Sequence, residues 1–244
     1  YRKGDPRMKS FGTMFKANLK ELLRDKGGLF WTLVLPICFI FLFGLIFTGE
    51  GQGISFHYIL PGILAMALMQ LGLFGALQFL SLRERKIIRG LSITPLSRSS
   101  ILSSEILIRI LVGFVQTVII ITLGVTVFDF SLEGSIIKIF LVVFLGSLTF
   151  VSFGYMLICF VKSMEAGNGL AQVVQLPMIF LSGVFFPVAM MPDFMQPVVK
   201  IIPLTYLADL LRQVMIGIPG QFSLTVNLLV LSSWLVFTFI ITVK

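Results

Sequence analysis

Long apolar runs recur along this chain of 244 residues, and they limit its possible folds more than any other feature. A helix needs about 20 apolar residues to cross a hydrocarbon core of roughly 30 Å, and each run is close to that length or above it. The strands of a membrane barrel are shorter, about 9–11 residues, and alternate in polarity, whereas these runs are continuously apolar. The sequence therefore predicts an all-α integral membrane protein with six transmembrane helices in one domain, residues 1–244. The runs cover about residues 29–48, 58–82, 106–128, 136–161, 170–188 and 224–243.

Basic residues are distributed unevenly over the connections between these runs. Eight of the 19 Lys and Arg residues precede the first run and five lie between the second and the third, whereas the opposite side has only Lys138, Lys200 and Arg212. Because cytoplasmic loops carry the excess of Lys and Arg, both termini are predicted to be cytoplasmic, in a bacterial cell membrane. The net charge of +8 agrees with attraction to anionic lipid head groups. Nucleic-acid binding is disfavoured, because the predicted fold has no separate domain to carry a basic face. Arg109, just inside the third run, is expected to extend its guanidinium toward the membrane surface.

Residues 10–25, SFGTMFKANLKELLRD, have apolar side chains at helical spacing and basic ones on the other side. A basic amphipathic helix of this kind lies along the membrane surface. It could serve as a plain interfacial anchor or as a docking element for a cytoplasmic partner.

The predicted cytoplasmic loop over residues 83–105 is longer than a simple connection, which needs about 2–8 residues. Apolar residues among basic ones predict a short amphipathic helix at about 84–93. Thr94 is then suited to be the N-cap of the next helix, with Pro95 at its first position. A short helix presented to the cytoplasm indicates a binding partner.

The segment FFPVAMMPDFMQPVVKIIPLTY, residues 185–206, holds four prolines in an apolar context. Proline breaks helices, and broken backbone at membrane depth is tolerated only when it is buried in protein or lines a cavity. The segment 189–220 is therefore predicted to be re-entrant: it enters the extracytoplasmic half of the membrane and returns through residues 204–217. Asp209 and Arg212, three residues apart, are able to pair on that returning limb.

Residues 182–217 closely resemble the signature region of ATP-binding-cassette type-2 permeases, the transmembrane subunits of exporters for drugs, lipids, polysaccharides and peptides. The resemblance extends over essentially the whole chain. The matching positions are Gly183, Phe186, Pro187, Met191, Pro192, Gln196, Pro203, Leu204, Thr205, Tyr206, Asp209 and Arg212.

The resemblance implies that the loop after the second span couples to a separate ATPase subunit, which would bind ATP and Mg. This sequence departs from the family pattern at one point, because Lys86 and Ile87 occupy the positions at which many family members have Gly-Thr. It further implies a second permease copy or paralogue as a partner, within membrane lipid, and an outer gate in the re-entrant segment. The implied coupling residues are Glu84, Arg85, Lys86, Arg89, Thr94 and Pro95, and the implied gate residues are Phe186, Pro187, Pro192, Pro203, Tyr206, Asp209 and Arg212.

In this family the second and fifth spans line the transport pathway. Polar, methionine and phenylalanine residues of these two spans are therefore candidates for the pathway. Any single candidate could instead be a packing residue, since a hydrogen bond between helices is worth only about 0.6 kcal/mol on average. As a set, they suit an amphipathic or hydrophobic substrate. The resulting candidates are Met66, Met69, Gln70, Phe74, Gln78, Gln172, Gln175 and Phe180.

The sequence lacks the common motifs for nucleotide binding, metal binding and catalysis. It has no G-x-x-x-x-G-K-[ST] phosphate loop, and its single histidine, His57, rules out a His-based metal site or a Ser-His-Asp triad. The chain is predicted to be a transport subunit with no cofactor or metal of its own rather than an enzyme. An ion-coupled transporter or a passive channel is the alternative, although none of the 11 acidic residues lies near the middle of a predicted span.

Overall fold

The structure is a computed structural model that describes residues 12, 15, 16, 18–20, 22–24, 26–47, 55–84 and 98–243. In these ranges all regular secondary structure is helical, which confirms the predicted all-α class. The elements are α2 (Lys26–Phe47), α3 (Phe56–Glu84), α5 (Arg98–Phe128), α6 (Ile136–Cys159), α7 (Met164–Leu181), a 3-10 turn (Val188–Met190), α8 (Gln196–Val199), α9 (Pro203–Ile216) and α10 (Leu224–Val243).

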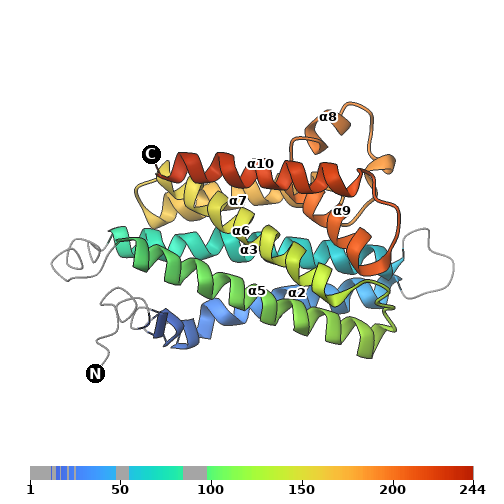
Figure 1. Cartoon of the computed structure of the whole chain (residues 1–244), viewed down its shortest axis with the longest axis horizontal. Helices are drawn as coiled ribbons and strands as arrows, with labels where there is room; N and C mark the ends of the chain where they lie inside the picture. The colour runs from blue at the N-terminus through green and yellow to red at the C-terminus, as the bar shows by residue number, and fades with distance from the viewer. Residues whose placement is uncertain are drawn as a thin grey trace, which may run out of the picture.

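Four helices in the described part of the chain are long and apolar enough to cross a membrane, namely those over Phe56–Glu84, Leu102–Phe128, Ile136–Cys159 and Leu224–Thr242. A shorter apolar helix covers Thr32–Phe47. The long helices run side by side, and the bundle has two ends (Figure 1). At one of them α3 and α10 end and α5 and α7 begin; we call it the loop-85–97 end. The count of six transmembrane helices stays a prediction.

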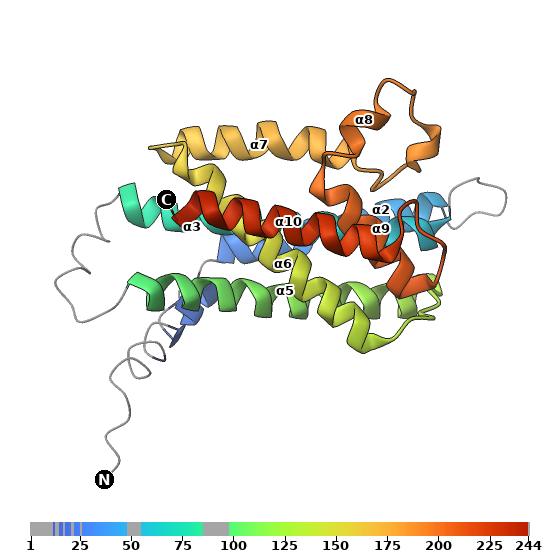
Figure 2. The ribbon, with the colours of Figure 1, turned by 45° about the horizontal axis from the view of Figure 1, so that its top comes forward.

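The helix α3 lies at the centre of the bundle and contacts α2, α5, α6, α7 and α9. In Figure 2, α7 lies along one side of the molecule and α5 along the other, with α6 and α10 between them. Glycine permits the closest of these contacts. A side chain at Gly72 would collide with the backbone of Phe150 on α6, and one at Gly154 would collide with the carbonyl of Gly72. Small residues at a helix interface allow backbones to approach in this way.

The ends of two helices differ from the predicted spans. The helix α5 begins eight residues before the predicted start at 106, and α7 covers 164–181 instead of 170–188. Ser163 sets the start of α7, since its side chain accepts a hydrogen bond from the backbone N–H of Ala166. Gly183, with a φ of +75°, follows its end. Caps and turn residues decide where a helix ends, whereas hydropathy only marks where it is apolar.

The proline-rich segment is broken into short pieces, as its sequence predicts. Pro197 and Pro203 lie in the first turns of α8 and α9, where a missing N–H is harmless. The four-residue helix α8 projects from one side of the bundle, near the end opposite the loop-85–97 end, whereas α9 is buried along nearly its whole length against α3, α6 and α10 (Figure 1). Whether the segment is re-entrant stays a prediction.

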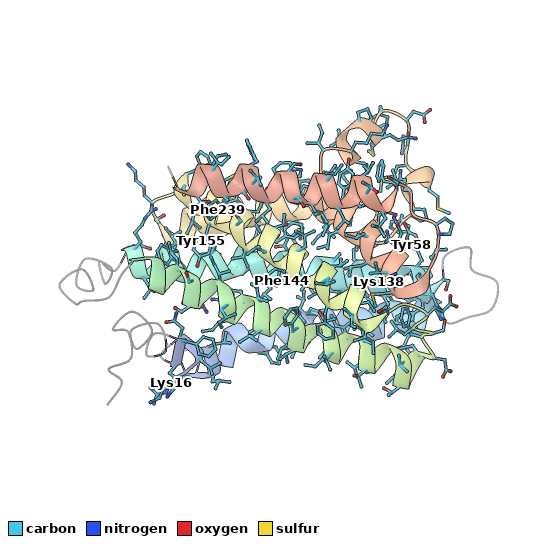
Figure 3. The ribbon with its side chains drawn as sticks, viewed as in Figure 1. Lys16, Tyr58, Lys138, Phe144, Tyr155 and Phe239 are labelled. Carbon is cyan, nitrogen blue, oxygen red and sulfur yellow. The ribbon has the colours of Figure 1, made fainter. Side chains whose placement is uncertain are left out.

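The predicted interfacial helix over 10–25 is described only in part. The described residues between 12 and 24 are helical, and the Asn18 side chain donates a 3.0 Å hydrogen bond to the Ser104 hydroxyl on α5. Figure 3 places Lys16 and Tyr155 toward the loop-85–97 end, and Tyr58 and Lys138 toward the opposite one. The predicted cytoplasmic and external basic residues Lys16 and Lys138 therefore lie at different ends of the bundle.

Candidate functional site

A cavity of about 620 Å³ lies between α2, α3, α5 and α7, and we call it the α3–α7 cavity. This volume is within the range of about 300–1,000 Å³ that small-molecule sites occupy. Carboxamides provide most of its polar lining. It is lined by Leu22, Gly28, Thr32, Leu35, Gln70, Leu71, Phe74, Gly75, Leu77, Gln78, Arg109, Met164, Asn168, Gln172 and Gln175.

Helical periodicity explains why these side chains meet. On α3, Gln70, Phe74 and Gln78 are spaced by four residues and share one face. On α7, Asn168, Gln172 and Gln175 are spaced by four and three and share another face. Because α3 contacts α7, the two polar stripes line the same cavity. The result is an amphipathic chamber with carboxamide groups on α3 and α7, apolar side chains chiefly on α2 and α3, and Arg109 on α5.

Arg109 projects into the bundle, and the expectation that it extends to the membrane surface is wrong. Its side chain is only 7% exposed and forms an ion pair with Glu105 on the same helix, with 3.5 Å between Nη2 and Oε2. The same Nη2 donates to the Gln78 side chain and to the carbonyl of Gly75. Gly75 makes room for the guanidinium, because a Cβ atom there would lie 2.7 Å from Nε. A paired, hydrogen-bonded guanidinium can stay inside, whereas an isolated one would have to reach water.

The predicted pathway residues fall into three groups. Five line the α3–α7 cavity: Gln70, Phe74, Gln78, Gln172 and Gln175. Met66 and Met69 are fully buried in the hydrophobic core. Phe180 is 63% exposed and lines a separate pocket near the 3-10 turn. A role in transport stays a prediction for all of them.

Two side chains in the last turn of α3 form hydrogen bonds with the backbone where α6 ends and α7 begins. Arg83 donates to the carbonyls of Ile158 and Val161, at 3.4 and 2.5 Å, near the end of α6. Glu84 accepts a 3.0 Å hydrogen bond from the backbone N–H of Met164, the first residue of α7. An acidic side chain is favourable at a helix N-terminus, where the free N–H groups carry partial positive charge. We call Arg83 and Glu84 together the corner clamp.

Among the predicted coupling residues, Glu84 is the one that the structure describes, and it belongs to the corner clamp. The others, Arg85, Lys86, Arg89, Thr94 and Pro95, lie outside the described residues, as does most of the short helix predicted over 84–93.

Arg212 on α9 binds the opposite end of α3 and the turn after α7. Its Nε donates to the carbonyl of Tyr58 at 3.0 Å, and its Nη2 donates to the carbonyls of Gly183 and Val184 at 2.7 and 2.9 Å. The guanidinium carbon lies 3.7 Å from the centre of the Tyr58 ring, a cation–π contact. Arg212 thus joins three segments that are distant in the sequence.

Asp209 binds a different set of partners. Its carboxylate accepts hydrogen bonds from the backbone N–H groups of Gln221 and Phe222, at 2.9 and 3.1 Å, and from the Asn227 side chain on α10, at 2.8 Å. Between residues that the structure describes, the ion pair found within 4.0 Å joins Glu105 and Arg109. Asp209 and Arg212, which the sequence suggests are able to pair, do not form such a pair. Each charge is satisfied instead by several fixed polar groups, which suits a buried charge.

The predicted gate residues surround two pockets instead of one. Pro187, Asp209 and Arg212 line a cavity of about 280 Å³ together with Tyr58. Phe186 and Pro192 line a pocket of about 330 Å³ with Phe180. Of the remaining two, Pro203 starts α9, and the Tyr206 hydroxyl donates a 2.6 Å hydrogen bond to the carbonyl of Lys200.

Sequence reasoning missed several of these side chains. Asn168, Arg83, Tyr58 and the Glu105–Arg109 pair were not among the candidates. A signal did exist for the pair: Glu105 precedes Arg109 by four residues at the edge of an apolar run, and ionisable residues within spans usually face the protein interior.

Comparisons with known proteins identify a family and several relatives. A family model described as "ABC-2 type transporter" matches residues 9–216. The putative transport permease YvfS of Bacillus subtilis (strain 168) is 24% identical over 201 residues, which are 77% of this chain and 78% of the relative. Nodulation protein J of Neorhizobium galegae is 25% identical over 216 residues, 84% of this chain and 80% of the relative. The probable multidrug ABC transporter permease YbhR of Escherichia coli (strain K12) is 22% identical over 158 residues, 64% of this chain and 43% of the relative.

Proposed function

Because the chain belongs to the ABC-2 type transporter family, we propose that it is the permease subunit of an ATP-driven exporter for an amphipathic or hydrophobic substrate. A drug, a lipid or a peptide would fit this description. The observation that carries the proposal is the α3–α7 cavity, which combines carboxamides with apolar walls in a volume suited to a small amphiphile. The relative from Escherichia coli is named a multidrug permease, which supports the drug class.

The proposed motor is a separate ATPase subunit that binds ATP and Mg and contacts the loop over residues 85–97. The corner clamp supports this arrangement, because Arg83 and Glu84 immediately precede that loop and hydrogen-bond to the ends of α6 and α7. A displacement of the loop would be transmitted through Glu84 to the start of α7, which forms one wall of the cavity. Nucleotide binding can shift the permease only by its differential affinity for the two conformations.

The proposed topology has six transmembrane helices, both termini in the cytoplasm and the loop-85–97 end facing the ATPase in a bacterial cell membrane. The positions of Lys16 and Lys138 at opposite ends of the bundle support it, because Lys16 belongs to the basic N-terminal segment (Figure 3). In this orientation α8 and α9 lie at the outer end, and residues 189–220 would enter the outer half of the bilayer.

The proposed assembly contains two permeases surrounded by lipid. One side of α7 supports it, because Val173, Leu176 and Phe180 are 69%, 56% and 63% exposed in the single chain. Apolar side chains this exposed need either lipid or another protein surface around them. A second copy against this face would bring two cavities close to a shared axis.

Reconstitution tests the proposal. The chain and its ATPase, co-purified and placed in proteoliposomes, should accumulate a fluorescent amphiphile only when ATP and Mg are supplied. The permease alone should hydrolyse no ATP. Conduction of ions across a bilayer by the permease alone would contradict the proposal and favour a channel.

One observation favours a second candidate. The buried Glu105–Arg109 pair is of the kind that ion-coupled carriers use, since ionisable groups inside a membrane often relay protons. An ion-coupled carrier would move substrate in response to a pH gradient without ATP, and the same proteoliposomes can be tested for this.

A further inference from the structure

The charge and the hydrogen-bonding groups of the α3–α7 cavity, in addition to its size and polarity, indicate which ligand it binds. We infer that the cavity binds the anionic head group of an amphiphile, a carboxylate or a phosphate, against Arg109. The role of this site in export rests on the proposed function, whereas binding itself does not.

The charge of the cavity lining favours an anion. Among the described residues that line the cavity, only Arg109 carries a charge, and the other polar side chains are neutral. Glu105 pairs with Arg109 but does not itself line the cavity. A ligand inside the cavity therefore meets Arg109 and not the Glu105 carboxylate. Coulomb attraction is stronger in a partly dehydrated chamber than in water, so one cation can decide the sign of the preferred ligand.

Arg109 also has unused hydrogen-bonding capacity. The contacts of Arg109 with Glu105, Gln78 and Gly75 all use Nη2. Its Nε is buried and has no hydrogen-bond partner. A guanidinium offers five N–H donors in a planar fork that matches the oxygens of a carboxylate or a phosphate. Since a buried polar group without a partner is energetically unfavourable, a small shift of Arg109 onto an anionic ligand would be favourable.

The surrounding residues suit the rest of an amphiphile. The carboxamides of Gln70, Gln172 and Gln175 can donate to further head-group oxygens or accept from hydroxyl groups. Leu35, Leu71 and other apolar side chains of the same cavity provide contact for a hydrocarbon portion. A fully hydrophilic anion would leave these apolar walls without contacts, so the site favours an amphiphile over a free ion.

Binding of two matched probe pairs to the full chain in dodecyl maltoside tests the inference. One pair is fluorescently labelled dodecanoic acid and its neutral amide; the other is labelled lysophosphatidic acid and zwitterionic lysophosphatidylcholine. Fluorescence anisotropy gives the dissociation constants. We expect the anionic member of at least one pair to bind about tenfold more tightly, which corresponds to about 1.4 kcal/mol. The pair that shows the preference identifies the head group as carboxylate or phosphate.

Variants with opposite expected effects separate binding from a structural role. Glu105→Gln removes the charge that competes for Arg109 and should tighten binding of the anionic probe several-fold. The double variant Glu105→Gln/Arg109→Gln removes both charges of the pair together and should abolish the preference while keeping a cooperative unfolding transition. Lys138→Gln removes a cation outside the cavity and should leave the preference unchanged.

The inference is overturned if the wild-type chain does not distinguish the members of either pair. It is also overturned if the double variant retains the preference, or if Lys138→Gln abolishes it as well. Since no ATPase is present, these results are independent of transport. Anion preference without ATP-driven accumulation would contradict the proposed function alone, and accumulation without anion preference would contradict this inference alone.

Discussion

Asp209 and Arg212 lie less than one helical turn apart on α9, yet they bind different parts of the protein. Arg212 donates to carbonyls of α3 and of the turn after α7, whereas Asp209 accepts from the segment before α10 and from Asn227 within it. The helix α9 therefore joins α3, α7 and α10 at one end of the bundle. A direct Asp209–Arg212 pair would satisfy only the two charges and would join nothing.

Replacing Arg212 should destabilise the protein. Arg212→Gln would deprive the carbonyls of Tyr58, Gly183 and Val184 of a charged donor, and we expect a loss of roughly 2–4 kcal/mol in the free energy of unfolding. Unfolding by SDS in mixed micelles measures it. Lys200→Gln, which removes an exposed cation from the same segment, is the control and should change the value by less than about 0.5 kcal/mol. Equal effects of the two variants would contradict the role of Arg212.

The contact between α3 and α6 depends on glycine. Gly72→Ala places a methyl group into the backbone of α6 and should lower the free energy of unfolding by about 1–3 kcal/mol. Gly169→Ala on α7 is a matched control, because a Cβ atom there has no neighbour within 4 Å. That variant should be neutral or stabilising by up to about 1 kcal/mol, since alanine favours helix. The same unfolding assay compares them, and a stable Gly72→Ala protein would rule out the close contact.

The corner clamp should matter for coupling more than for folding. Glu84→Ala removes the acceptor at the start of α7, so motion of the loop would no longer reach the cavity. With the ATPase in proteoliposomes, we expect substrate moved per ATP hydrolysed to fall about tenfold or more, with ATP hydrolysis retained. Glu165→Gln alters an exposed acid one residue into α7 and serves as the control. Unchanged stoichiometry in Glu84→Ala would show that the loop acts through another contact.

Labelling tests the orientation of the bundle. In a background without Cys38 and Cys159, a membrane-impermeant maleimide should label Lys138→Cys on intact cells. Lys16→Cys should react only after the membrane has been opened. These results are expected because the two residues lie at opposite ends of the bundle and Lys16 belongs to the basic segment (Figure 3). The reverse pattern would invert the proposed topology.

The family resemblance, which implies that spans two and five line the pathway, predicted part of the candidate site. Gln70, Phe74, Gln78, Gln172 and Gln175 were selected together, and the structure gathers them around one cavity because their helical spacing puts them on the facing sides of α3 and α7. Met66 and Met69 were selected on the same grounds but face the hydrophobic core. Residue type cannot separate these cases, since the side of α3 that faces α7 depends on the whole bundle.

The all-helical class and the approximate positions of the helices follow from the sequence alone. They depend on stretches of apolar residues, and in a membrane each such stretch must satisfy its own backbone hydrogen bonds whatever its neighbours are. The partners of the buried charges follow only from the tertiary structure. Arg109 faces a cavity and Arg212 binds three carbonyls because other helices, far away in sequence, bring compensating groups to them. A charged side chain can be buried only where those groups are in place, so its location depends on how the helices pack together.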